Sequence, residues 1–264
     1  MISKRQAIYI PMKRRAALNW LRRWDHQQEG YMPFREDRFR VMGDVLETLF
    51  KGPFAAMDLA CGPGSLSVRM LERFPRARIV AVDHDPVLLK IGQTALGDQG
   101  GRLRWVDADI GSPSWARDLS IPRVDAVLST TALHWLRPRE LRTLYPVLGA
   151  TIRKGGVFMN GDHMPFGRDS PKVSRLATSW VHANTRNAFI RSKAESWEEW
   201  WGAIRKDPEF SAEFAERLGR YPAHHSDEAR LSPETHARFL KAAGFKEVAV
   251  IWQRMDNRVL MALR

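Results

Sequence analysis

The sequence predicts an α/β fold, a Rossmann-like and mostly parallel sheet of seven strands with helices on its faces. Between residues 54 and 162, short apolar runs alternate with helical patterns, beginning with AAMDLA (55–60) and a helix from Leu66 to Phe74. Such alternation indicates parallel βαβ units. The chain ends in two apolar runs, 248–254 and 258–264, separated by a three-residue turn. These runs predict an antiparallel hairpin that completes the sheet.

The remaining elements follow in order along the chain. The expected strands are 78–83, 103–110, 124–133 and 155–162, and the expected helices are Pro86 to Ala95 and Arg139 to Ile152. A last helix is expected over 231–245. There Ser232 precedes Pro233, which is typical of an N-cap followed by proline in the first turn, and Gly244 suits the helix C-terminus.

Two further segments are helical in pattern and flank this core. We divide the chain into an N-terminal helical segment (1–50), a Rossmann-like core (51–162 and 231–264) and a helical cap inserted after the fifth strand (163–230). Within the first segment, helices are expected near 16–26 and 38–50, with Gly30 and Pro33 in a connecting loop. We expect both helical segments to lie above the carboxyl edge of the sheet as a lid.

Composition limits the setting and the partners. The chain has no apolar run of the length a membrane span needs, and no apolar leader with a cleavage site, so neither a membrane partner nor secretion is expected. Cys61 is the only cysteine, which excludes an intramolecular disulfide. A reducing, cytoplasmic setting is therefore expected.

The net charge of +12 favours anionic partners such as nucleic acid or acidic metabolites. The basic residues gather near the N-terminus: Lys4, Arg5, Lys13, Arg14, Arg15, Arg22 and Arg23.

The segment AAMDLACGPGSLSVRML (55–71) indicates a ligand loop between a strand and a helix. Glycines there let the chain turn sharply and let a ligand approach the backbone. A phosphate-binding P-loop would need Gly-Lys-Ser/Thr, which is absent, and the G-x-G-x-x-G dinucleotide fingerprint fails at Ser67. The pattern D-x-x-x-G-x-G fits Asp58, Gly62 and Gly64.

DLACGPGSLS resembles motif I of class I S-adenosylmethionine (SAM)-dependent methyltransferases. The neighbouring residues strengthen the resemblance: Asp83 ends the second expected strand, and Asp109 with Ile110 ends the third. The segment STTALHWL (129–136) looks like the corresponding segment of the trans-aconitate methyltransferase-like branch. The resemblance implies SAM as cofactor and S-adenosylhomocysteine (SAH) as product. It implies cofactor contacts from Asp58, Ala60, Gly62, Gly64, Asp83, His84, Asp109, Ile110 and Ser129.

Candidate residues for the methyl acceptor follow the fourth and fifth strands, where ligands bind in open α/β sheets. His134 and His163 are candidate general bases, because histidine titrates near neutral pH. The expected pocket walls are Trp135, Trp197 and Trp201. No metal is expected: the pair His224 and His225 has no evident third ligand.

The acceptor class stays open at this stage. STTA replaces the [D/N/S]-P-P-[Y/F/W] motif of amino-group methyltransferases, and Cys61 is poorly placed for cytosine C5 chemistry. We expect methyl transfer to the oxygen, nitrogen or carbon of a small molecule, plausibly a carboxylate in secondary metabolism, by a monomer or homodimer. The alternatives are an RNA-modifying methyltransferase, and a SAM-binding protein that catalyses a cyclisation or rearrangement.

Overall fold

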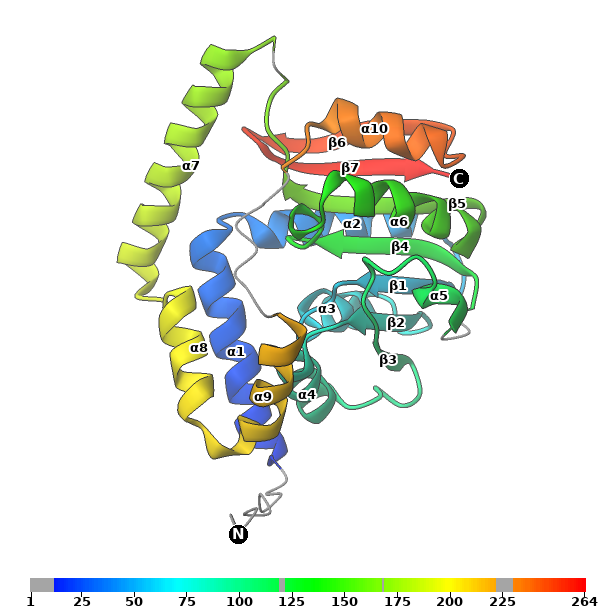
Figure 1. Cartoon of the computed structure of the whole chain (residues 1–264). Helices are drawn as coiled ribbons and strands as arrows, with labels where there is room; N and C mark the ends of the chain where they lie inside the picture. The colour runs from blue at the N-terminus through cyan, green and yellow to red at the C-terminus, as the bar shows by residue number, and fades with distance from the viewer. Residues whose placement is uncertain (1–11, 119–121, 168, 222–229) are drawn as a thin grey trace.

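The computed structural model describes residues 12–118, 122–167, 169–221 and 230–264, and its centre is a seven-stranded sheet (Figure 1). The strand order is β3-β2-β1-β4-β5-β7-β6. Strands β1 to β5 are parallel, and β7 runs antiparallel to both β5 and β6. The strand bounds are β1 Ala55–Leu59, β2 Arg78–Asp83, β3 Leu103–Asp107, β4 Val124–Thr130, β5 Ile152–His163, β6 Glu247–Arg254 and β7 Asn257–Leu263. The predicted fold class, including the terminal hairpin, is confirmed.

Helices cover both faces of the sheet. One face packs on α2 (Arg35–Leu49), α3 (Ser65–Arg73) and α4 (Pro86–Leu96), and the other on α5 (Trp115–Asp118), α6 (Pro138–Thr151) and α10 (Pro233–Ala242). Each face has its own apolar core. Along β1, Ala56 packs into the core under α2, α3 and α4, and Met57 packs into the core under α5, α6 and α10, because successive strand side chains point to opposite faces. Both faces are apolar and covered, so the carboxyl edge of the parallel strands is the place left for polar side chains.

Local signals account for several helix ends. Ser232 caps α10 as predicted, with its hydroxyl facing the backbone N–H of Thr235. Asp85 caps α4 by accepting hydrogen bonds from the backbone of Val87 and Leu88. Helix ends leave unpaired N–H groups that such side chains satisfy.

The expected connecting loop is confirmed at Pro33 but is wrong at Gly30. Helix α1 runs from Arg14 to Tyr31 and α2 begins at Arg35, so Gly30 lies inside a helix. The Phe189 ring of α7 packs so closely there that a Cβ on Gly30 would lie 2.7 Å from it. Glycine at this position therefore serves helix packing, whereas its backbone flexibility suggested a turn.

The N-terminal helix and the cap share one aromatic core. The cap contains α7 (Pro171–Ser192), α8 (Trp197–Lys206), the short helix η2 (Pro208–Phe210) and α9 (Ser211–Arg220). Trp200 of α8 is fully buried and makes edge contacts with Trp20 and Trp24 of α1, at ring-centroid distances of 5.6 and 5.1 Å. Edge-to-face packing of this kind is favourable beyond the burial of area alone.

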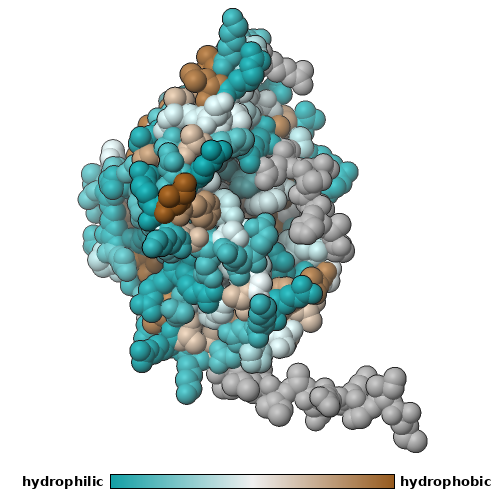
Figure 2. All heavy atoms as spheres, turned by 90° about the vertical axis from the view of Figure 1, so that its left-hand side faces the viewer, coloured by the Kyte–Doolittle hydropathy of each residue, from teal (hydrophilic) through white to brown (hydrophobic). Residues whose placement is uncertain are grey.

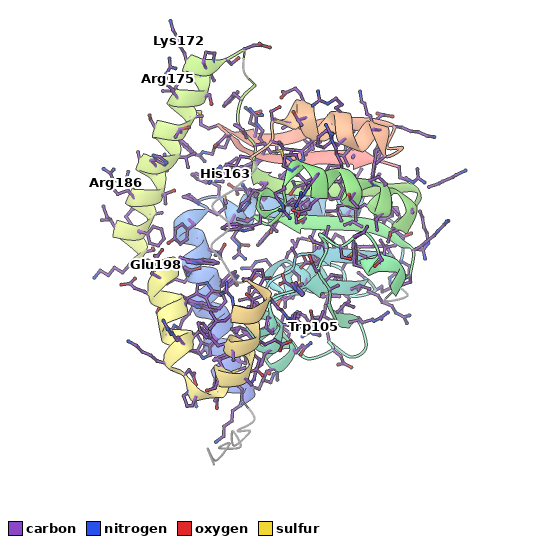
Figure 3. All side chains as sticks on the ribbon, viewed as in Figure 1. Trp105, His163, Lys172, Arg175, Arg186 and Glu198 are labelled. Carbon is purple, nitrogen blue, oxygen red and sulfur yellow. The ribbon has the colours of Figure 1, made fainter. Side chains whose placement is uncertain are left out.

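Helix α7 stands apart from the sheet, along the outer side of α1 (Figure 1). Ala177 is the only α7 residue among those described that is buried. Lys172, Arg175 and Arg186 project from it away from the sheet (Figure 3), and its outer face is largely hydrophilic with scattered apolar side chains (Figure 2). Among the described residues, no helix has the length and apolarity to cross a bilayer.

We expect Trp200→Ala to reduce the free energy of unfolding by about 3–5 kcal/mol, because it opens a large cavity between α1 and α8. Urea denaturation followed by circular dichroism measures this loss. Leu176→Ala on α7 is the matched control, since Leu176 is 62% exposed and its truncation should change stability by less than about 0.5 kcal/mol. Equal losses in the two variants would contradict the shared aromatic core.

Candidate functional site

The loop between β1 and α3 turns sharply at the carboxyl edge. Gly62 and Gly64 have φ of 55° and 85°, in the left-handed region that favours glycine. A Cβ on Gly64 would also lie 2.6 Å from the Trp105 ring. Ala60 adopts φ of 55° without being glycine, a strained conformation that clusters at functional sites. The predicted ligand loop therefore has the backbone shape that its glycines suggested.

Asp58, near the end of β1, is hydrogen-bonded to the first turn of α3. Its Oδ2 accepts hydrogen bonds from the Ser67 backbone N–H at 3.0 Å and the Ser67 hydroxyl at 2.7 Å. Burial raises the pKa of Asp58 to about 7, although the bonds from Ser67 oppose that shift. In this structure Asp58 fixes the first turn of α3, a role that the motif alone did not suggest.

Asp83 links the end of β2 to the same loop. One carboxylate oxygen accepts from the Gly62 N–H at 2.7 Å, and the other accepts from the N–H groups of His84 and Asp85, each at 2.8 Å. Burial, together with the negative charge of Asp85, raises the pKa of Asp83 to about 6. The Asp83 carboxylate thus lies at the junction of the loop and the second strand.

The other predicted cofactor residues surround this junction. The third strand is shorter than expected: β3 ends at Asp107, so Asp109 and Ile110 lie in the loop after it. Asp109 accepts from the Gly111 N–H, and Ile110 is buried in the apolar core under α5, α6 and α10. The Ser129 hydroxyl donates to the Leu59 carbonyl oxygen at 2.9 Å, which ties β4 to the end of β1. The structure therefore brings these residues to one edge, but it commits the Ser129 hydroxyl to the backbone.

The N-terminal helices reach the loop through side chains that no sequence motif marked. Asp25 of α1 accepts from the Ser65 hydroxyl at 2.6 Å and from Arg35 at 2.8 Å. Beside it, the Trp24 indole lies 3.8 Å from where a Cβ on Gly62 would be. Buried, paired charges of this kind follow no short motif, and burial of Arg35 on a helix has no signal in the local pattern.

His134 and Asp162 form a pair at the ends of β4 and β5. The His134 ring Nδ1 lies 2.8 Å from Asp162 Oδ1, and the His134 backbone N–H donates to Asp162 Oδ2 at 3.2 Å. Burial would raise the pKa of Asp162, but the charges of His134, Arg38 and His163 hold it well below its usual range. An ionised Asp162 favours the tautomer in which Nδ1 carries hydrogen and Nε2 is free to accept a proton.

A second His–Asp pair and a buried arginine complete this side of the edge. His163, which is labelled in Figure 3, is the last residue of β5. Its Nδ1 lies 3.0 Å from Asp256 Oδ1. Arg38 is fully buried, pairs with Asn257, and donates to the Gly161 carbonyl oxygen at 2.9 Å and the Thr131 hydroxyl at 3.2 Å. Burial lowers the pKa of Arg38 to about 10, so this guanidinium remains charged at neutral pH.

The predicted pocket tryptophans lie in two places. Trp135 is 49% exposed, and its ring centroid lies 5.0 Å from that of His134. Trp197 and Trp201 contact each other within the aromatic core of the cap, where Trp197 also meets Trp24. The structure brings only Trp135 to the His134 side. A lining role for Trp197 and Trp201 stays a prediction.

The described ranges contain no cluster of three or more potential metal-ligating side chains. His224 and His225 lie outside the described residues. Cys61 is a buried residue of the loop itself, and burial raises the pKa of its thiol well above the usual value. A thiol of this kind is a poor nucleophile, because the thiolate is the reactive form.

Comparison with known proteins identifies the core. Residues 56–156 match the family described as a methyltransferase domain. The sheet order and the loop geometry agree with that match. Residues 56–156 are a class I SAM-dependent methyltransferase domain. The methyltransferase domain match ends before the cap begins, and it covers β1 to β4 and the first residues of β5.

Curated relatives extend the methyltransferase match. Trans-aconitate 2-methyltransferase of Azoarcus sp. (strain BH72) is 32% identical over 149 residues, which cover 56% of this chain and 53% of that protein. The enzyme of the same name from Rhodopseudomonas palustris (strain BisB18) is 25% identical over 188 residues, covering 69% and 68%. The chain thus spans about half the length of the first of these relatives and two thirds of the second.

Solved structures show the same methyltransferase fold at low identity. An O-methyltransferase family protein from Burkholderia thailandensis has a TM-score of 0.53 and 17% identity, covering 98% of this chain and 65% of that one. A putative SAM-dependent methyltransferase from Methanococcus maripaludis has a TM-score of 0.52 and 15% identity, covering 100% and 97%.

We expect acid to destabilise the wild-type chain more than Asp162→Asn. The folded state holds the pKa of Asp162 below its unfolded value, so its stabilisation is present above about pH 4 and is lost as pH falls. Between pH 6 and pH 3 the wild type should lose about 1 kcal/mol more unfolding free energy than the variant. Urea titrations at both pH values measure the difference. Parallel losses would show that Asp162 is not held ionised.

Proposed function

We propose that this chain transfers a methyl group from SAM to a small-molecule acceptor. The observation that carries the proposal is the junction of Gly62 and Asp83 at the carboxyl edge, beside the His134–Asp162 pair. Strands β1 and β4 are neighbours, so a cofactor over β1 and β2 lies next to an acceptor over β4 and β5. In open α/β sheets ligands occupy this edge, where the strand order reverses.

The residues present fit SAM. The glycine loop and the start of α3 suit the methionine end, since glycines allow close approach and unpaired N–H groups face the ligand. Asp83 retains carboxylate lone pairs for the ribose hydroxyls beside the backbone bonds that it accepts. Asp109 and Ile110 are the proposed adenine contacts. When bound, SAM supplies a methyl group on a positively charged sulfur, and the chain aligns it for in-line displacement.

His134 is the proposed acid–base group. Asp162 holds its ring through Nδ1, which leaves Nε2 to take a proton from an acceptor hydroxyl or amine while the new bond to the methyl group forms. The products are then the methylated acceptor, SAH and a proton on His134. His163, held by Asp256 in the same way, is the alternative base.

A carboxylate is the first acceptor that we propose to test, because the curated relatives are named for trans-aconitate. A carboxylate oxygen carries no proton at neutral pH, so in that case His134 would orient the acceptor by hydrogen bonding. A hydroxyl acceptor would instead need the base. The two acceptor classes therefore differ in how strongly they depend on His134.

The second candidate function is methylation of RNA, which the net charge of +12 favours. The N-terminal cations only partly support it. Arg14 donates to the Ala95 carbonyl oxygen, and Arg23 pairs with Glu195 while lying over the Trp20 ring. These two arginines hold the molecule together and are not free for phosphate. RNA-dependent turnover that falls steeply with salt would support this candidate.

Three further assignments extend the proposal. A role in secondary metabolism, a cytoplasmic setting and a monomeric or homodimeric state accompany the small-molecule assignment. A chain that binds SAM and converts an acceptor without releasing SAH would instead be a cyclase or rearrangement catalyst.

We expect SAH to bind the wild type in calorimetry, with an affinity that falls as pH drops below about 6 because Asp83 becomes protonated. Asp83→Asn should weaken binding by about one to two decades, the value of a charge-assisted hydrogen bond, and its affinity should vary less with pH. Asp37→Asn, which alters an exposed pair with Arg40, is the matched control. No binding to the wild type would overturn the proposed function. Unchanged affinity in Asp83→Asn would exclude the ribose contact.

We expect His134→Ala to lower the turnover of a hydroxyl or amine acceptor by about 10²–10⁴-fold, since it removes the general base. SAH affinity should stay within about threefold, because the pair lies at the ends of β4 and β5 and makes no hydrogen bond to the proposed cofactor residues of the β1–α3 loop. Turnover is measured as SAH released, with His163→Ala as the matched variant of the second pair. A large loss in His163→Ala alone would assign the base to His163. A loss of only a few fold in both variants would favour a carboxylate acceptor.

A further inference from the structure

Helix α9 of the cap lies against the ends of β2 and β3 through one face. Glu213, Arg217 and Arg220 are spaced by four and three residues, so their side chains emerge from the same side of the helix. Glu213 pairs with Lys90 at 2.8 Å, and Arg217 pairs with Asp85 at 2.6 Å. Figure 1 shows α9 beside α4, in agreement with these pairs.

Arg220 makes the most extensive of these contacts. Its two terminal nitrogens donate to the two carboxylate oxygens of Asp107, each at 2.7 Å, and one of them also donates to the His84 carbonyl oxygen at 2.7 Å. Asp107 is the last residue of β3, and His84 follows β2. A single guanidinium therefore bridges the ends of the two strands, in the bidentate geometry that arginine favours with carboxylates.

Tyr221, the residue after α9, extends the contact toward Asp83. Its ring centroid lies 6.0 Å from that of His84, and the Arg217 guanidinium lies over the Tyr221 ring at 5.2 Å. Burial, followed by the charges of Asp83 and Asp85, raises the pKa of the Tyr221 hydroxyl above its usual value, with a smaller contribution from Asp109. The end of the cap thus lies among the carboxylates that surround the proposed ribose and adenine contacts.

We propose that the end of α9 completes the subsite for the adenosine half of the cofactor, with Arg220 as a positioning residue and Tyr221 as a wall. This inference rests on the proposed function. Arg220 holds the two strand ends between which the adenosine would lie and neutralises Asp107 beside Asp83, Asp85 and Asp109. The cap would then form part of the cofactor-binding site as well as covering the acceptor.

SAH binding to the full chain, measured by calorimetry and stopped-flow, tests the proposal. Arg220→Gln should weaken SAH by about tenfold through faster dissociation, since the bridge between the strand ends is lost. Wild-type affinity should also fall with salt, which screens the partly exposed pair, and Arg220→Gln should lose most of that dependence. A change in fold stability alone would not produce this difference in salt dependence.

Arg23→Gln is the matched control. It breaks the pair between Arg23 and Glu195, which links α1 to the cap at similar exposure but lies away from β2 and β3. Its SAH affinity should stay within about twofold of wild type. Asp107→Asn is the second variant, should Arg220→Gln fail to fold, and it should show the same loss of affinity. Wild-type binding with equal affinities in Arg220→Gln, Asp107→Asn and Arg23→Gln would overturn this inference alone. Failure of the wild type to bind SAH would overturn the proposed function itself.

Discussion

The structure depends on one constraint: a parallel sheet with apolar side chains on both faces must be covered by helices on both faces. Helices α2, α3 and α4 cover one side, and α5, α6 and α10 cover the other. Polar groups that serve function are thereby confined to the carboxyl edge. Asp58, Asp83 and Asp162 all lie at or near strand ends on that edge, where the backbone turns and its N–H groups become available.

The buried carboxylates at the carboxyl edge differ in the direction of their pKa shifts because their neighbours differ. Asp58 and Asp83 accept mainly from backbone and hydroxyl groups and lie near other acids, so burial dominates and raises the pKa of each. Asp162 is equally buried, but the hydrogen bond with His134 and the charge of Arg38 keep it ionised. The half of the edge over β1 and β2 is thus suited to donors such as ribose hydroxyls and an ammonium group. The half over β4 and β5 is suited to holding an imidazole in one tautomer.

The cap lies outside the matched methyltransferase region, which ends at residue 156, but it contacts that region at the ends of β2 and β3. Trp20 and Trp24 of α1 pack with Trp200 of α8, so the N-terminal helix and the insertion share one aromatic core. Asp25 of the same α1 helix binds Ser65 beside the glycine loop. Helix α1 thus contacts both the cap and the cofactor loop, and α9 contacts the strand ends directly.

Local patterns in the sequence determined the order of strands and helices, the glycine loop, the positions of Asp83 and Asp109 and the cap of α10 at Ser232. These features depend on residues close together in the chain: strand alternation, turn glycines and helix caps act within a few residues. The same local patterns indicated the methyltransferase family, because the family's glycine-loop motif lies within one strand, one loop and one helix.

Only the tertiary structure decided which side chains pair across the edge. Arg38 meets Asn257 across 219 positions of the chain, and His134 meets Asp162 across 28. It also decided that Gly30 lies inside a helix against Phe189, that Asp58 is bound to Ser67, and that α9 lies on the ends of β2 and β3. The physical reason is that burial and partnership of a charged side chain depend on what packs against it. No local period in the sequence carries that information.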